Sequence, residues 1–234
     1  MTEGVELANG SDPVNGAEHG IVLDRVSIKR GNRVLFRDVS AAVAPGEVLA
    51  LVGPSGIGKS SLIHALLGEV SVAGGKIRIG GKLPPLPRQQ RKMLGFIPQE
   101  PRMSADPRLT LAETVAAPLS FGRGRIRPRA KDLNDRALVV WDRMGLEREL
   151  LDRKPHEVSD GQLQRALVVR GLVRPVKYLL ADEPTSALDT RTASLVWDVI
   201  KDVVEQDRAA AAIVSHDAPM LTAMATTTIH LTRQ

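Results

Sequence analysis

The chain has 234 residues, a length that suits one large domain or one domain with an inserted lobe. Of these residues 43% are apolar and 25% charged, a composition that excludes a disordered chain apart from its ends. Its net charge of +5 comes mainly from scattered arginines, and only 3% of residues are aromatic; this disfavours a nucleic-acid partner, because nucleic-acid-binding proteins concentrate basic charge and interleave aromatics. A surface near anionic lipid headgroups fits this composition better. The lack of cysteine excludes disulfides, thiolate metal sites and cysteine nucleophiles.

The N-terminal segment predicts a tail without a targeting signal. Residues 1–19 are acidic and rich in glycine and asparagine, without the basic start and apolar stretch of a signal peptide. No window of the sequence has the apolar length needed to cross a bilayer. We therefore expect a flexible tail, then a domain over 20–234, in a protein that stays in the cytoplasm.

The first half of that domain begins with strands. Residues 21–28 predict a strand, 34–36 and 39–43 predict two short extended runs, and 47–52 predict an apolar strand that ends at a glycine. A helix is expected over 62–67, stopped by Gly68. Between this strand and this helix lies the stretch Gly53-Pro54-Ser55-Gly56-Ile57-Gly58-Lys59-Ser60-Ser61.

That stretch matches the pattern G-x-x-x-x-G-K-[ST] in the context where it forms a phosphate-binding loop. Its glycines allow backbone N–H groups to converge on one point, and the following helix start adds to an anion site. Lys59 supplies a positive charge for the outer phosphates, and the Ser60 hydroxyl is suited to bind Mg²⁺. The alternative is a glycine-rich turn that matches by accident.

The middle of the chain changes from strands to helices. Strands are expected over 76–79 and 93–99, and helical spacing follows over 110–118 and 131–151. In the second helix Leu133, Ala137, Val140, Trp141 and Met144 fall on one face. The pattern predicts a helical lobe inserted at about 100–165.

Strands and helices then alternate to the end of the chain. Strands are expected over 176–181, 211–215 and 227–231, with helices over 190–206 and 218–225. Leu195, Val196, Val199, Ile200 and Val203 are the expected inward residues of the first of these helices. Such alternation predicts an α/β fold with a largely parallel sheet covered on both faces.

Two carboxylates end the strand at 176–181. Burying them is costly unless a cation meets them, so beside a phosphate loop Asp182 is suited to hold Mg²⁺ and Glu183 to polarise an attacking water. They could instead solvate a strand end or cap the next turn.

Ser159 and Gln162 form a capping box at the start of another helix, which is a complete structural explanation by itself. Gln99, His216 and Asp189 would each be ordinary loop or helix-start residues alone.

Taken in order, these pieces resemble the nucleotide-binding domain of ABC ATPases over about 21–232. The phosphate loop, the glutamine loop at Gln99, the signature at 158–162, the carboxylate strand, the loop at 186–189 and the switch histidine His216 follow the family's order. The resemblance implies a P-loop NTPase fold with an N-terminal antiparallel β part. Short runs around Gln99 and Ser159 also resemble the peptide and nickel importers.

The family resemblance implies a composite ATP site in a dimer of two such subunits, identical or closely related. Each site would combine the phosphate loop Gly53–Ser61 of one copy with Ser159, Gly161 and Gln162 of the other. Glu183 would be the general base, His216 would contact the γ-phosphate, Gln99 would reach Mg²⁺ and Asp189 would lie at the dimer seam. The helical lobe would dock on membrane permease subunits, at the inner face of the membrane.

The sequence departs from the family pattern in two places, and two other functions stay open. Asp160 stands where a glycine is usual, although it suits a helix start. Residues 28–31 offer no aromatic to stack on adenine, and Arg30 is the candidate to replace it.

One alternative function is a soluble ABC ATPase acting on nucleic acid or the ribosome, disfavoured by length and scarce aromatics. The other is a regulatory subunit with little turnover, disfavoured by Glu183 and His216.

Overall fold

A five-stranded parallel sheet forms the centre of the molecule. The computed structural model describes residues 19–31, 33–216 and 218–231, so nearly all of the predicted tail lies outside the described residues. The sheet has the order β5-β6-β7-β3-β8, and all its neighbouring strands are parallel, as the alternating pattern predicts. Its strands are β3 (Val48–Val52), β5 (Leu94–Ile97), β6 (Tyr178–Asp182), β7 (Ala210–Val214) and β8 (Thr227–His230).

The N-terminal part is a separate antiparallel sheet, as expected. It has the order β2-β1-β4, with β1 (Ile21–Arg30), β2 (Arg33–Val43) and β4 (Gly74–Ile79). The two short runs predicted at 34–36 and 39–43 are one strand, so that prediction is wrong. Asp38 between them adopts a φ of 53°, and its N–H donates to Ser27 Oγ at 3.1 Å. The pairing of this strand with β1 therefore shifts its register near Asp38, and the strand continues without a break.

The parallel sheet separates two apolar cores. Alternate residues of β6 illustrate the division: Leu179 and Ala181 belong to the core shared with α6 (Asp160–Leu172) and α7 (Thr190–Asp207). Tyr178 and Leu180 belong to the core shared with α1 (Lys59–Leu67) and the antiparallel strands. Successive side chains of a strand point to opposite faces, so both faces of the sheet are covered, as expected.

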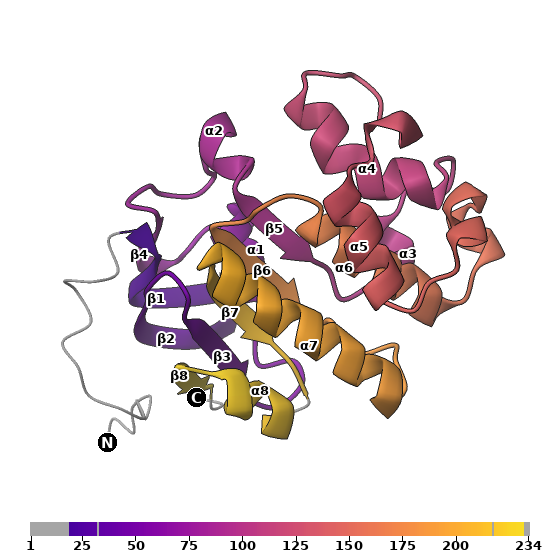
Figure 1. Ribbon diagram of the computed structural model, residues 1–234. Helices are drawn as coiled ribbons and strands as arrows, with labels where there is room; N and C mark the ends of the chain where they lie inside the picture. The colour runs from indigo at the N-terminus through magenta and orange to yellow at the C-terminus, as the bar shows by residue number, and fades with distance from the viewer. Residues whose placement is uncertain (1–18, 32, 217, 232–234) are drawn as a thin grey trace.

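A helical lobe lies on the side of the molecule away from the antiparallel sheet (Figure 1). It contains α3 (Pro101–Ser104), α4 (Leu111–Gly122), α5 (Asp135–Arg143) and the 3-10 turns η2 (Ala130–Asp132), η3 (Arg148–Asp152) and η4 (Pro155–Glu157). The predicted helix at 131–151 is therefore broken into pieces. One break lies at Gly145, whose φ of 61° cannot continue a right-handed helix. The predicted apolar face is otherwise correct, since Ala137, Val140, Trp141 and Met144 are buried.

The remaining helices are α2 (Arg88–Arg91) and α8 (Ala218–Met224). On α7 the expected inward residues are buried except Leu195, which is 38% exposed, while Trp197 is buried at 1%. Within the described ranges, no helix has the length and apolar character needed to span a membrane.

Candidate functional site

The phosphate loop connects β3 to α1, as predicted, and two of its glycines are required by geometry. Gly56 and Gly58 have φ values of 74° and 111°, which side chains rarely allow. At Gly58, a Cβ atom would also lie only 3.0 Å from Leu35 and 3.2 Å from the Phe36 ring. Glycine therefore lets the loop curve tightly ahead of α1, which begins directly after Gly58.

Lys59 is the first residue of α1 and is only 6% exposed. Its Nζ donates to the carbonyl oxygens of Gly53 at 2.7 Å and Pro54 at 3.2 Å. The ammonium group is therefore held against the loop that the sequence assigns to phosphate binding.

Ser60 and Asp182 meet beneath this loop. The Ser60 hydroxyl donates to Asp182 Oδ1 at 3.0 Å, and Asp182 is 2% exposed. Burial raises the pKa of Asp182, while the hydrogen bond from Ser60 opposes that shift. Within the described residues Asp182 makes no salt bridge.

This pair fits a magnesium site of the phosphate-loop type. The hydroxyl and carboxylate oxygens are the hard donors that Mg²⁺ prefers, and phosphate and water oxygens usually supply the rest of its ligands. The described part of the chain holds no group of three or more His, Cys, Asp or Glu side chains that could bind a metal ion without such additional ligands.

Glu183 follows Asp182 and is held by His216. Its Oε2 accepts a hydrogen bond from the His216 backbone N–H at 2.9 Å, and its Oε1 lies 3.2 Å from His216 Nε2. Glu183 is 3% exposed and has a φ of 48°, an unfavourable backbone conformation for this residue type. Strain of this kind concentrates at functional sites.

One pocket brings most of the predicted site residues together. Its volume is about 250 Å³. Gln99 enters it from the loop after β5, and Glu183 and His216 enter from the loops after β6 and β7. This is the edge at which the carboxyl ends of parallel strands meet. The lining is completed by Arg30, Leu35, Ser55, Gly56, Gly58, Lys59, Ser60 and Ser61.

Ser159, Gly161, Gln162 and Asp189 do not line this pocket. The predicted capping box at the start of α6 is confirmed: Gln162 N–H donates to Ser159 Oγ at 3.2 Å, and Ser159 N–H donates to Gln162 Oε1 at 2.9 Å. A Cβ at Gly161 would lie 3.3 Å from Leu188. The start of α6 therefore packs against the loop that leads to Asp189.

Asp189 caps α7, where it accepts hydrogen bonds from Thr192 N–H at 3.0 Å and Thr192 Oγ1 at 2.7 Å. These hydrogen bonds hold the pKa of Asp189 below its usual range, and the bond from the Thr192 backbone N–H has the larger effect. The predicted site residues thus form two groups, one around the pocket and one at two neighbouring helix starts.

The sequence interpretation missed a buried glutamine, Gln164, on α6. Its Nε2 donates to the carbonyls of Pro98 at 3.0 Å and Pro184 at 3.1 Å, so one amide joins the residue before Gln99 to the residue after Glu183. Its side chain is fully buried. Because α6 is apolar at most of its inward positions, a polar residue there was the available signal.

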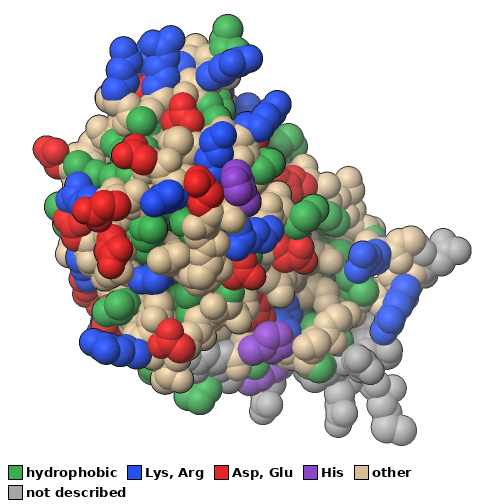
Figure 2. Space-filling view, turned by 90° about the vertical axis from the view of Figure 1, so that its right-hand side faces the viewer, with side chains coloured by type: hydrophobic (Ala, Val, Ile, Leu, Met, Phe, Trp, Pro, Cys, Tyr) green, Lys and Arg blue, Asp and Glu red, His purple; other side chains and the backbone are tan. Residues whose placement is uncertain are grey.

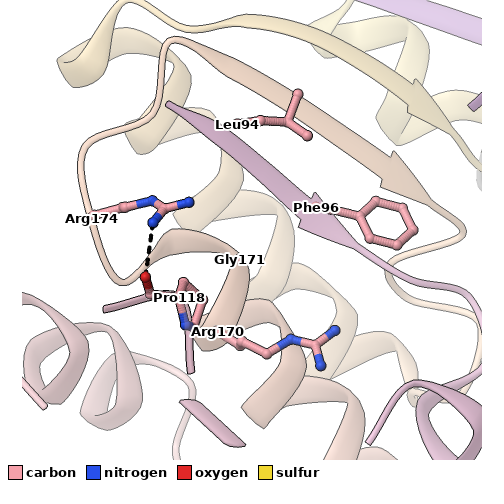
Figure 3. A pocket seen from close by; sticks show the side chains of 6 residues that line it. All are labelled: Leu94, Phe96, Pro118, Arg170, Gly171 and Arg174. Atoms are coloured by element: carbon pink, nitrogen blue, oxygen red, sulfur yellow. Dashed lines mark hydrogen bonds between the residues drawn. The ribbon is translucent and has the colours of Figure 1, made fainter. Parts of the chain in front are cut away.

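A second pocket, of about 150 Å³, lies where the lobe meets the edge strand β5 (Figure 3). Leu94 and Phe96 of β5, Pro118 of α4 and Gly171 of α6 contribute to its lining. Arg174 donates to the Pro118 carbonyl at 3.0 Å, and burial lowers the pKa of Arg170 to about 10. None of the predicted nucleotide-site residues lines this pocket.

Comparison with known proteins agrees with this geometry. The family described as ABC transporter matches residues 36–186. The zinc import ATP-binding protein ZnuC of Cereibacter sphaeroides is 33% identical over 91% of this chain and 79% of that protein. The oligopeptide transport ATP-binding protein OppF of Haemophilus influenzae is 33% identical over 77% of this chain and 55% of that protein.

Among solved structures, the dimeric post-hydrolysis state of the ATP-binding cassette MJ0796, bound to ADP and Pi, superposes with a TM-score of 0.77. Its sequence is 27% identical, over 90% of this chain and 94% of that one. The family match, the relatives and the P-loop fold agree: the chain belongs to the ABC transporter family, as a transport-coupled ATPase subunit.

Proposed function

We propose that this subunit hydrolyses ATP to ADP and phosphate in a dimer whose two sites each combine the pocket of one copy with the α6 start of the other. The observation that carries the proposal is the division of the site residues into two groups. The pocket holds Lys59, Glu183 and His216, whereas Ser159 and Gln162 lie outside it. A second copy would bring the two groups together.

The chemistry follows from the positions of the pocket residues. The loop N–H groups and Lys59 bind the phosphates. A water oxygen attacks the γ-phosphorus, its proton passes to the Glu183 carboxylate, and the bond to the β,γ-bridging oxygen breaks with its electron pair leaving on ADP. His216, which contacts Glu183, orients that carboxylate and reaches the γ-phosphate.

Mg²⁺ would be held by Ser60 and Asp182, with Gln99 from the pocket wall. When bound, it supplies positive charge to the phosphate oxygens. We assign Gly53, Pro54, Ser55, Gly56, Ile57, Gly58 and Ser61 to phosphate binding, and Ser159, Gly161, Gln162 and Asp189 to the dimer contact.

The partners proposed are membrane permease subunits, which would dock on the helical lobe at about 100–165. The pocket between β5, α4 and α6 supports this, because it lies at the junction of lobe and core and none of the predicted nucleotide-site residues lines it. Import is favoured by the names of the relatives, which include zinc import and oligopeptide transport proteins. Those names differ in cargo, so peptide or nickel stays one candidate among several.

A basic loop supports a position at the inner face of the membrane. Lys and Arg side chains gather at the upper end of the face in Figure 2, where the loop after α4 forms the top of the molecule. Arg127, Arg129 and Lys131 of this loop are exposed, and Ile126 among them is 94% exposed. Basic charge with an exposed apolar side chain suits anionic headgroups.

The decisive experiment uses the variant Glu183→Gln. Glutamine keeps the acceptor for the His216 N–H but cannot take a proton, so steady-state hydrolysis should fall by at least about 100-fold. The ATP-bound dimer should then accumulate, which light scattering measures. Hydrolysis at the wild-type rate would exclude Glu183 as the base, and a monomer with saturating Mg-ATP would exclude the composite site.

A further inference from the structure

Asp160, the first residue of α6, is tied to Arg102 of α3. Arg102 Nε lies 2.6 Å from Asp160 Oδ1, and Nη2 of the same guanidinium donates to the Val158 carbonyl at 2.8 Å. Its Nη1 donates to the Pro155 carbonyl. All three guanidinium nitrogens therefore hold one segment, residues 155–160. A planar guanidinium with divergent N–H groups can do this, whereas a lysine ammonium could not match the geometry.

The charge at this helix start has two opposite effects. A carboxylate at the first position of α6 is favourable toward the helix dipole. The same carboxylate, with 62% of its side chain exposed, would repel the triphosphate that the α6 start of one copy meets on its partner. Arg102 supplies the compensating positive charge, and its two carbonyl contacts fix where that charge lies.

From this arrangement we infer that Arg102 is a positioning residue of the composite ATP site, which neutralises Asp160 and holds the turn before α6 in place. The inference rests on the proposed function, because only a dimer brings α6 to a triphosphate. Arg102 lies three residues after Gln99, so the glutamine loop and the α6 start of one subunit are joined through a single side chain.

The exposed pair Arg148–Asp142 offers a matched comparison. Arg148 binds Asp142 through two nitrogens, at 2.7 Å and 2.6 Å, and both side chains are about half exposed. It lies in the same lobe, and the hydrogen bonds of the Arg148 side chain go to Asp142 and not to residues 155–160. Exposed pairs of this kind contribute little to stability. A functional effect confined to Arg102 would therefore not be a general effect of removing a lobe arginine.

The test places Arg102→Ala, Asp160→Asn, the double variant and Arg148→Ala in the Glu183→Gln background. Light scattering then measures the ATP concentration that gives half-maximal dimer. Arg102→Ala should raise it by roughly 3- to 10-fold, because an uncompensated negative charge faces the triphosphate. Adding Asp160→Asn to that variant should restore most of the loss, and higher salt should restore part of it. Arg148→Ala should change nothing.

Fluorescent-nucleotide binding to the monomer and melting temperature serve as internal controls. Nucleotide binding should be unchanged in Arg102→Ala, since neither Arg102 nor Asp160 lines the nucleotide pocket. The melting temperature, which the lost contacts to residues 155–160 lower at most modestly, shows that the variant is folded. An unimpaired Arg102→Ala overturns the inference. Equal impairment of the single and double variants also overturns it, because Arg102 would then act through the carbonyl contacts alone. If the Glu183→Gln parent itself stays monomeric, the composite site fails, and this inference fails with it.

Discussion

Asp182 is, at the scale of one residue, a buried carboxylate that lowers the stability of the fold when it is ionised. Its carboxylate is buried against a neutral hydroxyl, and burial raises its pKa. An acid whose pKa is higher in the folded than in the unfolded chain destabilises the fold when it is ionised. That penalty is present above the folded pKa and disappears below the ordinary value of about 4.

Asp182→Asn should therefore separate stability from activity. Asparagine keeps an acceptor for Ser60 without the buried charge, so the melting temperature at pH 7.5 should be equal or higher, and the gain should shrink as pH falls toward about 4. Mg²⁺-dependent ATP hydrolysis should be lost at the same time. Calorimetry at several pH values and a phosphate-release assay measure both. A lower melting temperature at pH 7.5 would contradict the buried-charge argument.

Lys59→Ala tests the phosphate loop directly. Removing the ammonium deletes the charge that the loop carbonyls of Gly53 and Pro54 hold in place, and ATP affinity should fall by at least about tenfold. Isothermal titration calorimetry gives the affinity. Lys76→Ala, on the exposed face of β4, is the matched control and should bind ATP normally. Undiminished binding in Lys59→Ala would mean that another cation serves the phosphates.

At the scale of elements, α4 and α6 both begin with a capping box, so the two helix starts can be compared. Thr110 and Glu113 form a complete capping box on α4, as Ser159 and Gln162 do on α6. The two helices begin with equivalent hydrogen bonds. Only the α6 start is assigned to a nucleotide, so the pair distinguishes a structural from a functional cap.

Ser159→Ala and Thr110→Ala should each destabilise the fold by about 1 kcal/mol, as loss of a cap usually does. Only Ser159→Ala should also weaken ATP-dependent dimerisation and slow hydrolysis, because its hydroxyl would face the partner's γ-phosphate. Thermal melting and a coupled ATPase assay compare the two. An equal loss of activity in both variants would mean that Ser159 acts only as a helix cap.

The elements that could be predicted from the sequence are those set by local pattern. Glycine spacing between a strand and a helix placed the phosphate loop, and S-x-x-Q placed the start of α6. The break at Gly145 was missed because apolar spacing continues across it. Contacts such as Gln164 to Pro98 join residues 66 apart in sequence, and no local pattern encodes them.

At the scale of the whole molecule, the pocket of about 250 Å³ has no aromatic side chain among its described lining residues. Arg30 and Leu35 are the lining residues that come from the antiparallel strands. Base stacking on an aromatic usually contributes about 1–3 kcal/mol, so its lack leaves the phosphates to dominate affinity.

ATP and GTP should accordingly bind within roughly threefold of each other, since both carry the same phosphates and stacking does not distinguish the two purines. Competition with a fluorescent nucleotide in the Glu183→Gln variant measures this ratio. Arg30→Ala should weaken both nucleotides alike if its guanidinium lies over the base. A strong preference for ATP would show that the base is read by groups other than these two residues.

The amide of Gln164 has a consequence for how the lobe can turn. One side chain of α6 donates hydrogen bonds to the Pro98 carbonyl after β5 and to the Pro184 carbonyl after β6. A rotation of α6 must therefore either move both of these loops or break one of the two hydrogen bonds. A displacement of α6 would thus reach the segments that carry Gln99 and Glu183 together, rather than either one alone.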